Sequence, residues 1–174
     1  ETNIILLRGE LHRREGKTAE ALADHALADT RTKSDDPARR LEPLLSLAET
    51  NLRAERYSDA ATNAERATTI ARGVYGESSC RVAEPLRVHA DALLGSGRAS
   101  EALPLAERAL SLARAAQVDP LAGARTEFAV ARALPVGDRE RARLLATSAR
   151  HVAARDSRDP RLAEHIDAWL AAAR

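Results

Sequence analysis

The sequence has little of what usually fills or cross-links a globular core. It contains one cysteine, no methionine and four aromatic residues among 174 positions. The single Cys80 excludes an internal disulfide and any metal site built from several cysteine ligands. Because strand-forming residues are scarce and helix-forming residues abundant, the composition favours helices that approach each other over small side chains. The aromatic residues are Tyr57, Tyr75, Phe128 and Trp169.

Long apolar runs and an excess of charge are also missing. No stretch approaches the roughly 20 apolar residues of a membrane-spanning helix, so we expect no membrane partner. Lys and Arg total 27 against 26 Asp and Glu, which gives a net charge of +1. This balance argues against nucleic acid as the main partner, because binding to phosphates needs a clear excess of positive charge. We expect a cytoplasmic protein.

Alanine, in contrast, supplies 38 residues and recurs with a period of about 40. Four turn-like segments each precede a helix that carries an anchor alanine: Ala21, Ala60, Ala102 and Ala142. The positions four and seven residues after the anchors are alanine in seven of eight cases, and the exception is His25. Regular repetition at this period is typical of a solenoid. These eight positions are His25, Ala28, Ala64, Ala67, Ala106, Ala109, Ala146 and Ala149.

Each repeat is predicted to be two helices joined by a tight turn. Asp36-Pro37, Asp119-Pro120 and Asp159-Pro160 each place a capping carboxylate before a proline that suits the first helical position. Small residues twelve positions before the anchors supply a flat face on the first helix: Gly9, Ala48, Ala90 and Val130. The expected helices are 3–14 with 18–32, 37–54 with 58–73, 79–95 with 99–115, and 120–134 with 138–154. A last helix is expected at 160–173. The repeats are thus 3–32, 37–73, 79–115 and 120–154 of one domain, 1–174.

The two-helix unit, with Gly9, Gly16, Ala21 and Ala28 in its first copy, resembles the tetratricopeptide repeat. The period of about 42 residues, and the segment 75–86 between two repeats, are similar to the kinesin light chain-like subclass. The resemblance implies an all-α, right-handed α-solenoid of four helix pairs with a C-terminal capping helix. It also implies a non-catalytic protein-interaction scaffold.

The C-terminal half, about 79–174, resembles the repeat array that closes large bacterial serine/threonine protein kinases. The resemblance is carried by residues 97–110, 128–134, 139–143 and 162–170. No glycine-rich phosphate loop and no His-Arg-Asp segment of a kinase is present. The resemblance implies a recruitment region of a signalling protein. The alternative is a sensory or oligomerisation module of a transcription regulator.

No group of residues in the sequence predicts a catalytic, metal or cofactor site. The five histidines lack the i, i+4 spacing of helical zinc ligands. Gly95-Ser96-Gly97-Arg98 joins two predicted helices, so we interpret it as a turn. Cys80 has no residue placed by sequence to activate it. The arginines between residues 138 and 161 suggest either an anion or nucleic-acid patch, or a solvated helix face with intrahelical pairs such as Asp138–Arg141.

The candidate partner site is an inner wall formed by the first helix of each pair. Acidic residues recur on it, with Arg13, Arg14 and Arg53 toward the turns. Such a row favours a protein or peptide partner of basic or mixed charge, and the alternative is a merely solvated polar face. The predicted groove residues are Glu10, Glu42, Glu49, Glu84, Arg87, Asp91 and Glu127.

Both ends of the array carry apolar side chains. Ile166, Trp169 and Leu170 form a stripe on the last helix, which either seals the fourth repeat or offers an anchor to a partner. At the other end, residues 4–7 are continuously apolar from Ile4 to Leu7. We expect two of these four side chains to be uncovered, the native protein to continue upstream with another helix, and this chain to self-associate through this edge.

Overall fold

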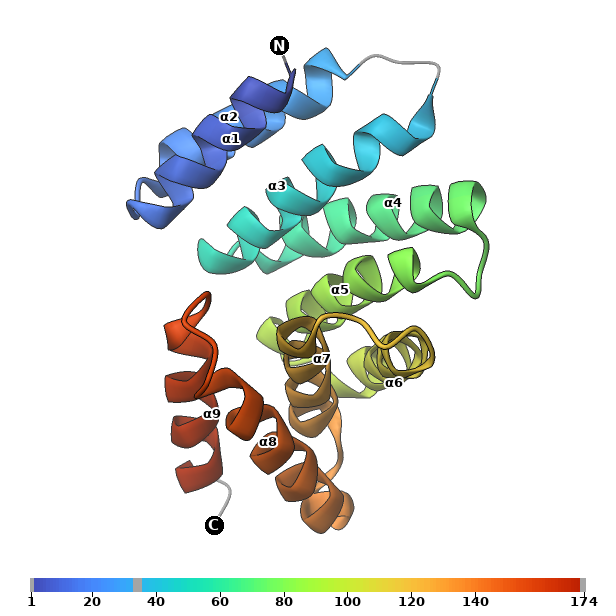
Figure 1. Ribbon diagram of the computed structural model, residues 1–174, viewed down its shortest axis with the longest axis vertical. Helices are drawn as coiled ribbons and strands as arrows, with labels where there is room; N and C mark the ends of the chain where they lie inside the picture. The colour runs from blue at the N-terminus through green and yellow to red at the C-terminus, as the bar shows by residue number, and fades with distance from the viewer. Residues whose placement is uncertain (1, 33–35, 173–174) are drawn as a thin grey trace.

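The computed structural model describes residues 2–32 and 36–172 (Figure 1). Within those residues the structure contains α-helices, three short 3₁₀ helices and no strand, and the predicted all-α solenoid is confirmed. Residue 173, where the last helix was predicted to end, lies outside the described residues. The α-helices are α1 (Thr2–Arg14), α2 (Thr18–Arg31), α3 (Leu41–Arg53), α4 (Tyr57–Tyr75), α5 (Ala83–Gly95), α6 (Ala99–Ala115), α7 (Pro120–Ala133), α8 (Arg139–Ala153) and α9 (Pro160–Ala172). The 3₁₀ helices are η1 (Pro37–Arg40), η2 (Cys80–Val82) and η3 (Val136–Asp138).

The helices pack as four successive pairs, α1 with α2, α3 with α4, α5 with α6 and α7 with α8. Each pair packs on the next along the chain, and α9 packs on α8. Figure 1 shows this succession, with the blue first pair and the red last helix at opposite ends of the chain. Such stacking is the one-dimensional arrangement of a solenoid, in which a repeat contacts mainly its neighbours.

The alanine stripe of the second helices forms the contact within each pair. All four anchors are buried, and Ala21, Ala60 and Ala102 have no exposed surface. The alanines four and seven positions later are also fully buried, as are Ala48 and Ala90 on the facing helices. Side chains this small allow two helix axes to approach closely, so the packing role predicted for these alanines is confirmed.

Two predicted helices begin later than expected because of proline. The predicted helix at 37–54 is η1 followed by α3, and the predicted helix at 79–95 is η2 followed by α5. Pro43 and Pro85 lack the N–H that an α-helix interior needs, so a proline fits best in the first turn, although α6 accommodates Pro104 in its interior. Each α-helix therefore begins two residues before its proline, and the preceding residues form a 3₁₀ turn.

Two of the three predicted aspartate caps form. The Asp36 carboxylate accepts a hydrogen bond from the backbone N–H of Ala38, and the Asp119 carboxylate accepts one from that of Ala122. The Asp159 carboxylate instead accepts from the Arg125 guanidinium at 2.7 Å. An exposed cap is replaced there by a contact between α7 and the start of α9.

None of the helices in the described part of the chain is long and apolar enough to cross a membrane.

His25, the exception in the alanine register, is accommodated by Gly9. A Cβ atom added to Gly9 would lie 2.5 Å from the imidazole ring, so only glycine leaves room on α1 for this side chain. The imidazole is buried, and its Nδ1 lies 2.9 Å from the hydroxyl oxygen of Thr50 on α3. Because that hydroxyl donates to the Ser46 carbonyl at 2.8 Å, Nδ1 carries the proton and donates to Thr50.

The junction between the first and second pairs is therefore largely polar. Besides the His25–Thr50 hydrogen bond, the Arg40 guanidinium donates to the Asp29 carboxylate at 2.9 Å. The apolar cluster of the first pair, Ile5, Leu6 and Ala28, includes no residue of α3 or α4. Later junctions differ, because single apolar clusters span α4 to α6 and α7 to α9.

Gly9→Ala should destabilise the protein by about 1–3 kcal/mol, because the added methyl group overpacks the contact with His25. In a chain that already carries His25→Ala, the same Gly9→Ala change should cost much less, since the ring is gone. Urea denaturation of the two single variants and the double variant measures this coupling. Additive effects would show that Gly9 and His25 are not matched to each other.

The same histidine predicts a loss of stability in acid. Burial, with a smaller effect from the nearby Arg13 charge, lowers the pKa of His25 below its usual value. The unfolded chain then binds a proton more readily than the folded chain, so stability is full above about pH 6.5 and falls as the pH drops below that value. Thermal melts across this range should show the fall, and the Gly9→Ala/His25→Ala variant should show a smaller one. Some fall remains because burial also lowers the pKa of His89.

The last helix covers the open face of the fourth pair mainly through Ile166. Ile166 has no exposed surface and packs with Leu162 against Phe128 of α7 and the alanines of α8. Trp169 and Leu170, the other two residues of the predicted stripe, are partly buried against the same cluster. The Trp169 ring meets the Phe128 ring edge to face, with centroids 6.1 Å apart.

The first helix, in contrast, presents an uncovered apolar edge. Ile5 and Leu6 are buried, whereas Ile4 is 71% exposed and Leu7 is 70% exposed. Two of the four side chains are thus uncovered, as the sequence predicts. Leu11, one turn later on the same helix, is 54% exposed and extends this edge.

Candidate partner-binding groove

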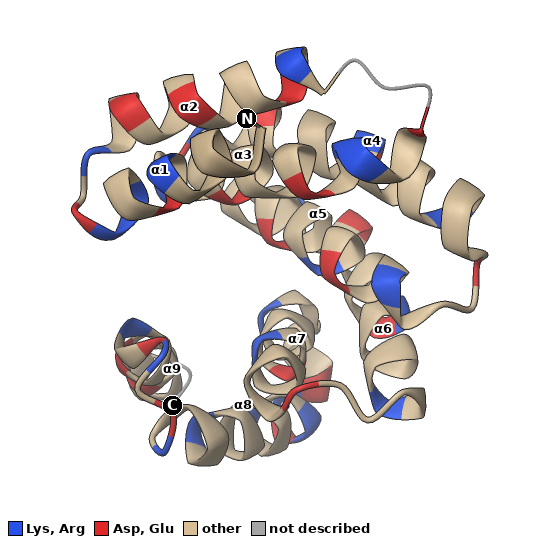
Figure 2. Cartoon of the chain, turned by 45° about the horizontal axis from the view of Figure 1, so that its top comes forward, with Lys and Arg blue, Asp and Glu red and all other residues tan. Residues whose placement is uncertain are grey.

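The inner side of the array encloses a cavity of about 770 Å³. Its walls come from the first helix of every pair, α1, α3, α5 and α7, and from α9. In Figure 2 the helices follow an arc, and α9 lies across the opening from α1. A cavity of this size falls within the usual range of ligand pockets, about 300–1,000 Å³.

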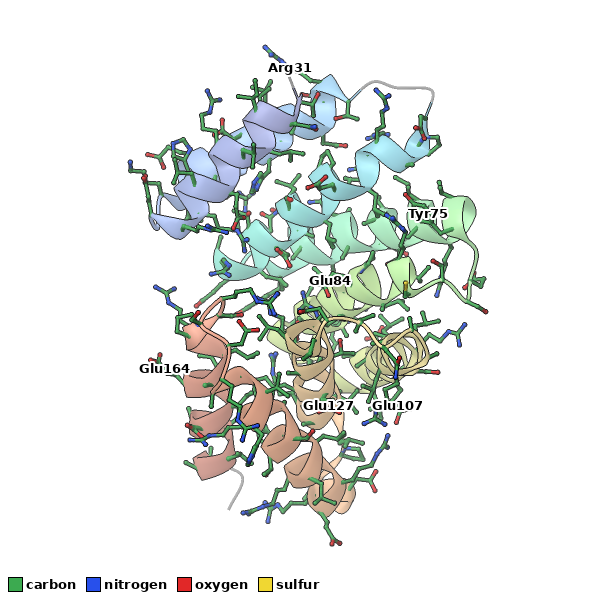
Figure 3. All side chains as sticks on the ribbon, viewed as in Figure 1. Arg31, Tyr75, Glu84, Glu107, Glu127 and Glu164 are labelled. Carbon is green, nitrogen blue, oxygen red and sulfur yellow. The ribbon has the colours of Figure 1, made fainter. Side chains whose placement is uncertain are left out.

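Three of the seven predicted groove residues line this cavity: Glu49, Arg87 and Asp91. The other four, Glu10, Glu42, Glu84 and Glu127, lie outside its lining. Glu42 is exposed, and Glu84 and Glu127, labelled in Figure 3, are half-buried on α5 and α7. The sequence register thus selected helices that line the cavity, but only three of its seven residues reach the lining.

Arg87 is the centre of a charge network that joins three helices. The buried guanidinium donates to Asp91 at 2.5 Å and to Glu84 at 2.6 Å on its own helix α5, and to Glu49 of α3 at 3.3 Å. Asp91 also accepts from Arg132 of α7 at 2.9 Å. Because a buried charge is tolerated only when it is paired, these groups hold one another in place.

The network also explains opposite pKa shifts in its two glutamates. Burial raises the pKa of Glu49, and Arg87 only partly offsets this. Burial acts in the same direction on Glu84, but the charge and hydrogen bonds of Arg87 hold the pKa of Glu84 below its usual value. Three carboxylates thus surround one guanidinium, whose own pKa is raised by them.

Two further acids of the predicted row, Glu10 and Glu127, are also paired within the chain. Glu10 accepts from Arg13 and, at 3.2 Å, from Arg14, while Glu127 accepts from Arg114 at 3.1 Å. Arg13 in turn lies 3.5 Å from Glu49, so ion pairs continue from α1 to α7. Reversing Glu10, Glu49 and Asp91 to Lys would disrupt this network. We therefore expect this triple reversal to destabilise the fold as well as to change the charge of the inner wall.

Two arginines of the cavity wall differ from the rest. Arg53, at the end of α3, and Arg161, in the first turn of α9, are exposed and line the cavity. Neither has a carboxylate within 4.0 Å in the described residues. Arg53 is exposed only in part. Its partial burial, and secondly the like charge of Arg13, lower the pKa of Arg53 below its usual value. The other cavity arginines are Arg13, Arg87, Arg125 and Arg132, each paired with a carboxylate.

Sequence reasoning missed the contribution of α9 to the cavity. Arg161, His165 and Trp169 line it, whereas the sequence singled out only Trp169 of these three, as part of a seal or as a partner anchor. The signal was the spacing of these three residues at i, i+4 and i+8, which places them on one helix face. The sequence prediction for this helix rests instead on its apolar stripe, Ile166, Trp169 and Leu170.

Three of the seven arginines in segment 138–161 are held in ion pairs. Arg141 pairs with Glu107 of α6 at 2.9 Å, and not with Asp138 as predicted. Arg150 pairs with Asp167 at 3.1 Å, and Arg158 with Asp119 at 2.8 Å. These pairs connect neighbouring elements.

In the described part of the chain no group of three or more His, Cys, Asp or Glu residues could hold a metal ion.

Comparisons with known proteins agree with this architecture. The family model described as "Tetratricopeptide repeat" matches residues 39–115. No curated protein matches the sequence. Among solved structures, BtubC (BKLC) from P. vanneervenii matches with a TM-score of 0.72 and 21% identity over 88% of this chain and 63% of BtubC.

Two further solved structures share the fold. A Rap protein complexed with Competence and Sporulation Factor matches with a TM-score of 0.75 and 18% identity over 87% of this chain and 42% of that one. The apo form of RapI matches with a TM-score of 0.71 and 14% identity over 97% of this chain and 63% of RapI. This chain therefore spans less than two thirds of each of these proteins.

Proposed function

We propose that this tetratricopeptide-repeat array is a non-catalytic scaffold that binds a protein partner in its concave cavity. The observation that supports this most directly is the cavity itself, to which every first helix and α9 contribute. Stacked pairs hold these walls in place before binding, so little conformational entropy is lost when a partner enters. One of the proteins of the same fold, a Rap protein, is recorded in complex with Competence and Sporulation Factor.

A partner of mixed charge suits the cavity better than a purely basic one. The acids of the wall are already bound by arginines of the same chain, so a basic partner would have to displace Arg87 or Arg13. Desolvated charge pairs broken in this way are costly to lose. A partner that carries both signs can add to the network without dismantling it.

The resemblance of residues 79–174 to the closing repeats of bacterial serine/threonine kinases supports a more specific proposal. In it, the array recruits a substrate or regulator to an attached signalling domain in the cytoplasm. The parent protein would supply the catalysis, and this segment would supply the contact.

The experiment is capture of partners from a lysate of the source organism on the immobilised chain. Ala168→Trp fills the cavity from α9 without changing charge, because Ala168 is exposed and lines it. Ala171→Trp is the matched control, since Ala171 is exposed on the same helix outside the lining. We expect Ala168→Trp to lose partners that the wild type and the control retain, as identified by mass spectrometry. Equal capture by both variants would exclude the cavity as the binding site.

The exposed edge of α1 favours a second function, self-association. Ile4, Leu7 and Leu11 form an apolar stripe that nothing in the described chain covers, and stripes of this kind usually mark an interaction surface. An array that pairs through this edge would suit the oligomerisation module of a transcription regulator. This is the alternative to recruitment.

Light scattering against concentration tests this second function. We expect the molar mass of the wild type to rise with concentration, and Ile4→Ser/Leu7→Ser to remain monomeric, because the substitution removes the apolar stripe. The matched control is Val136→Ser/Leu144→Ser, two exposed apolar residues elsewhere on the array, which should associate like the wild type. A wild type that is monomeric at every concentration would contradict self-association.

A further inference from the structure

We infer that the cavity binds an acidic peptide segment that bridges Arg53 and Arg161. This deepens the proposed function, on which it rests only for placing the partner in the cavity. The two arginines are more than 100 residues apart in sequence. They come from the second helix pair and from the capping helix, yet they line the same cavity.

The charge of the lining supports an anionic ligand. Six arginines line the cavity against four carboxylates, Glu49, Glu55, Asp91 and Asp159, so arginine exceeds acid by two. Arg13, Arg87, Arg125 and Arg132 are held by carboxylates of this chain. Among the described residues, Arg53 and Arg161 are the two lining arginines that no carboxylate holds.

The surroundings of Arg53 point the same way. Its pKa is lowered first by burial and then by the like charge of Arg13, so the positive charge at this position is not fully compensated by the chain. A ligand carboxylate placed there would form a charge-assisted hydrogen bond with a planar, five-donor guanidinium. The same holds for Arg161, which lines the same cavity and is exposed.

A peptide fits this arrangement better than a nucleic acid does. The four lining carboxylates are interspersed with the arginines and would repel a continuous row of phosphates. A peptide can space its acids so that they meet Arg53 and Arg161 and leave uncharged residues opposite Glu49 and Asp91. Phe128 and Trp169 line the same cavity, and their apolar rings suit such uncharged residues. Here the capping helix forms one wall of the binding site as well as covering the fourth pair.

Trp169 provides a direct readout, because it is the only tryptophan and lines the cavity. The probe is a short peptide of alternating glutamate and alanine, titrated into the intact chain while tryptophan emission is recorded. We expect a saturable change that weakens as salt is raised, since the contacts are ionic. Matched peptides of alternating glutamine and alanine, and of alternating lysine and alanine, should produce none.

Arg53→Gln and Arg161→Gln should each weaken binding of the glutamate peptide by about tenfold, the usual effect of losing one hydrogen bond to a charged group. Arg143→Gln is the matched control, because Arg143 is an exposed arginine of α8 outside the cavity. It should bind like the wild type. Circular dichroism checks that all three variants remain folded, as expected for exposed side chains without an ion pair in the described chain.

Three results would overturn the inference: a glutamate peptide that binds no better than the glutamine peptide, arginine variants that bind like the wild type, or oligothymidylate that binds while the peptide does not. The last result would assign the site to nucleic acid. If Ala168→Trp abolishes partner capture and the glutamate peptide does not bind, the inference fails and the proposed function stands. If Ala168→Trp leaves capture unchanged, the proposed function fails by itself.

Discussion

Replacing Arg87 with Met should destabilise the protein by about 3–5 kcal/mol, the usual cost of removing one partner of a buried ion pair. The guanidinium is buried and donates to Glu49, Glu84 and Asp91. Methionine fills similar space but removes the cation that the three carboxylates share, so that Glu84 loses its guanidinium and only Arg13 and Arg132 remain beside Glu49 and Asp91. Guanidinium chloride denaturation at pH 7 measures the loss.

The pH dependence of this loss identifies its cause. Without the cation, burial should raise the pKa values of Glu49 and Glu84 above those of the unfolded chain, so the folded variant binds protons more readily. The variant should therefore gain stability relative to the wild type as the pH falls from 7 toward 5. A deficit that stays constant over this range would mean that Arg87 contributes packing and not charge compensation.

Ile166→Ala should destabilise the protein by about 2–5 kcal/mol, because it removes a fully buried side chain from the contact between α9 and the fourth pair. Ile166 has no exposed surface and packs in the cluster that also holds Leu162 and Phe128. Thermal denaturation followed by circular dichroism at 222 nm, converted to a free energy of unfolding, provides the measurement.

Leu144→Ala is the matched control, since Leu144 is 67% exposed on α8 and its truncation should change stability by no more than about 0.5 kcal/mol. Trp169→Ala should cost less than the size of the side chain suggests, because part of the ring borders the cavity. An Ile166→Ala variant as stable as the control would show that α9 does not need this contact to stay on the array.

The sequence predicted the helix contacts that recur in every repeat, and missed the side-chain contacts that are particular to one place in the array. The alanine register located the second helices because a small residue is required at every close helix contact, and the structure buries those alanines. His25 broke the register, and its partner Gly9 was recognised only as a small residue. The match between the two is three-dimensional, and no spacing in the sequence encodes it.

The site was harder to predict for the same reason. Glu49, Arg87 and Asp91 were selected as a wall open to a partner, but they bind one another across α3 and α5. Pairs separated by 38 or 41 residues, such as Glu49–Arg87 and Asp91–Arg132, depend on how far each repeat is rotated against the next. That rotation follows from side-chain packing along the whole array. Arg161 and His165 were missed because α9 follows the four repeats and has no counterpart in them.

The polar junction between the first two helix pairs has a consequence for cooperativity. A stacked array unfolds as units coupled only to their neighbours, so the weakest interface decides which unit opens first. The apolar cluster of α1 and α2 stops at this interface, which His25–Thr50 and Asp29–Arg40 close instead. The first pair should therefore open as a separate unit, exchanging its backbone amide protons for deuterium while α5 to α9 remain protected. Arg53 and Arg161, the two residues inferred to hold the peptide, lie outside the first pair, so this opening removes only the part of the cavity wall that the first pair supplies.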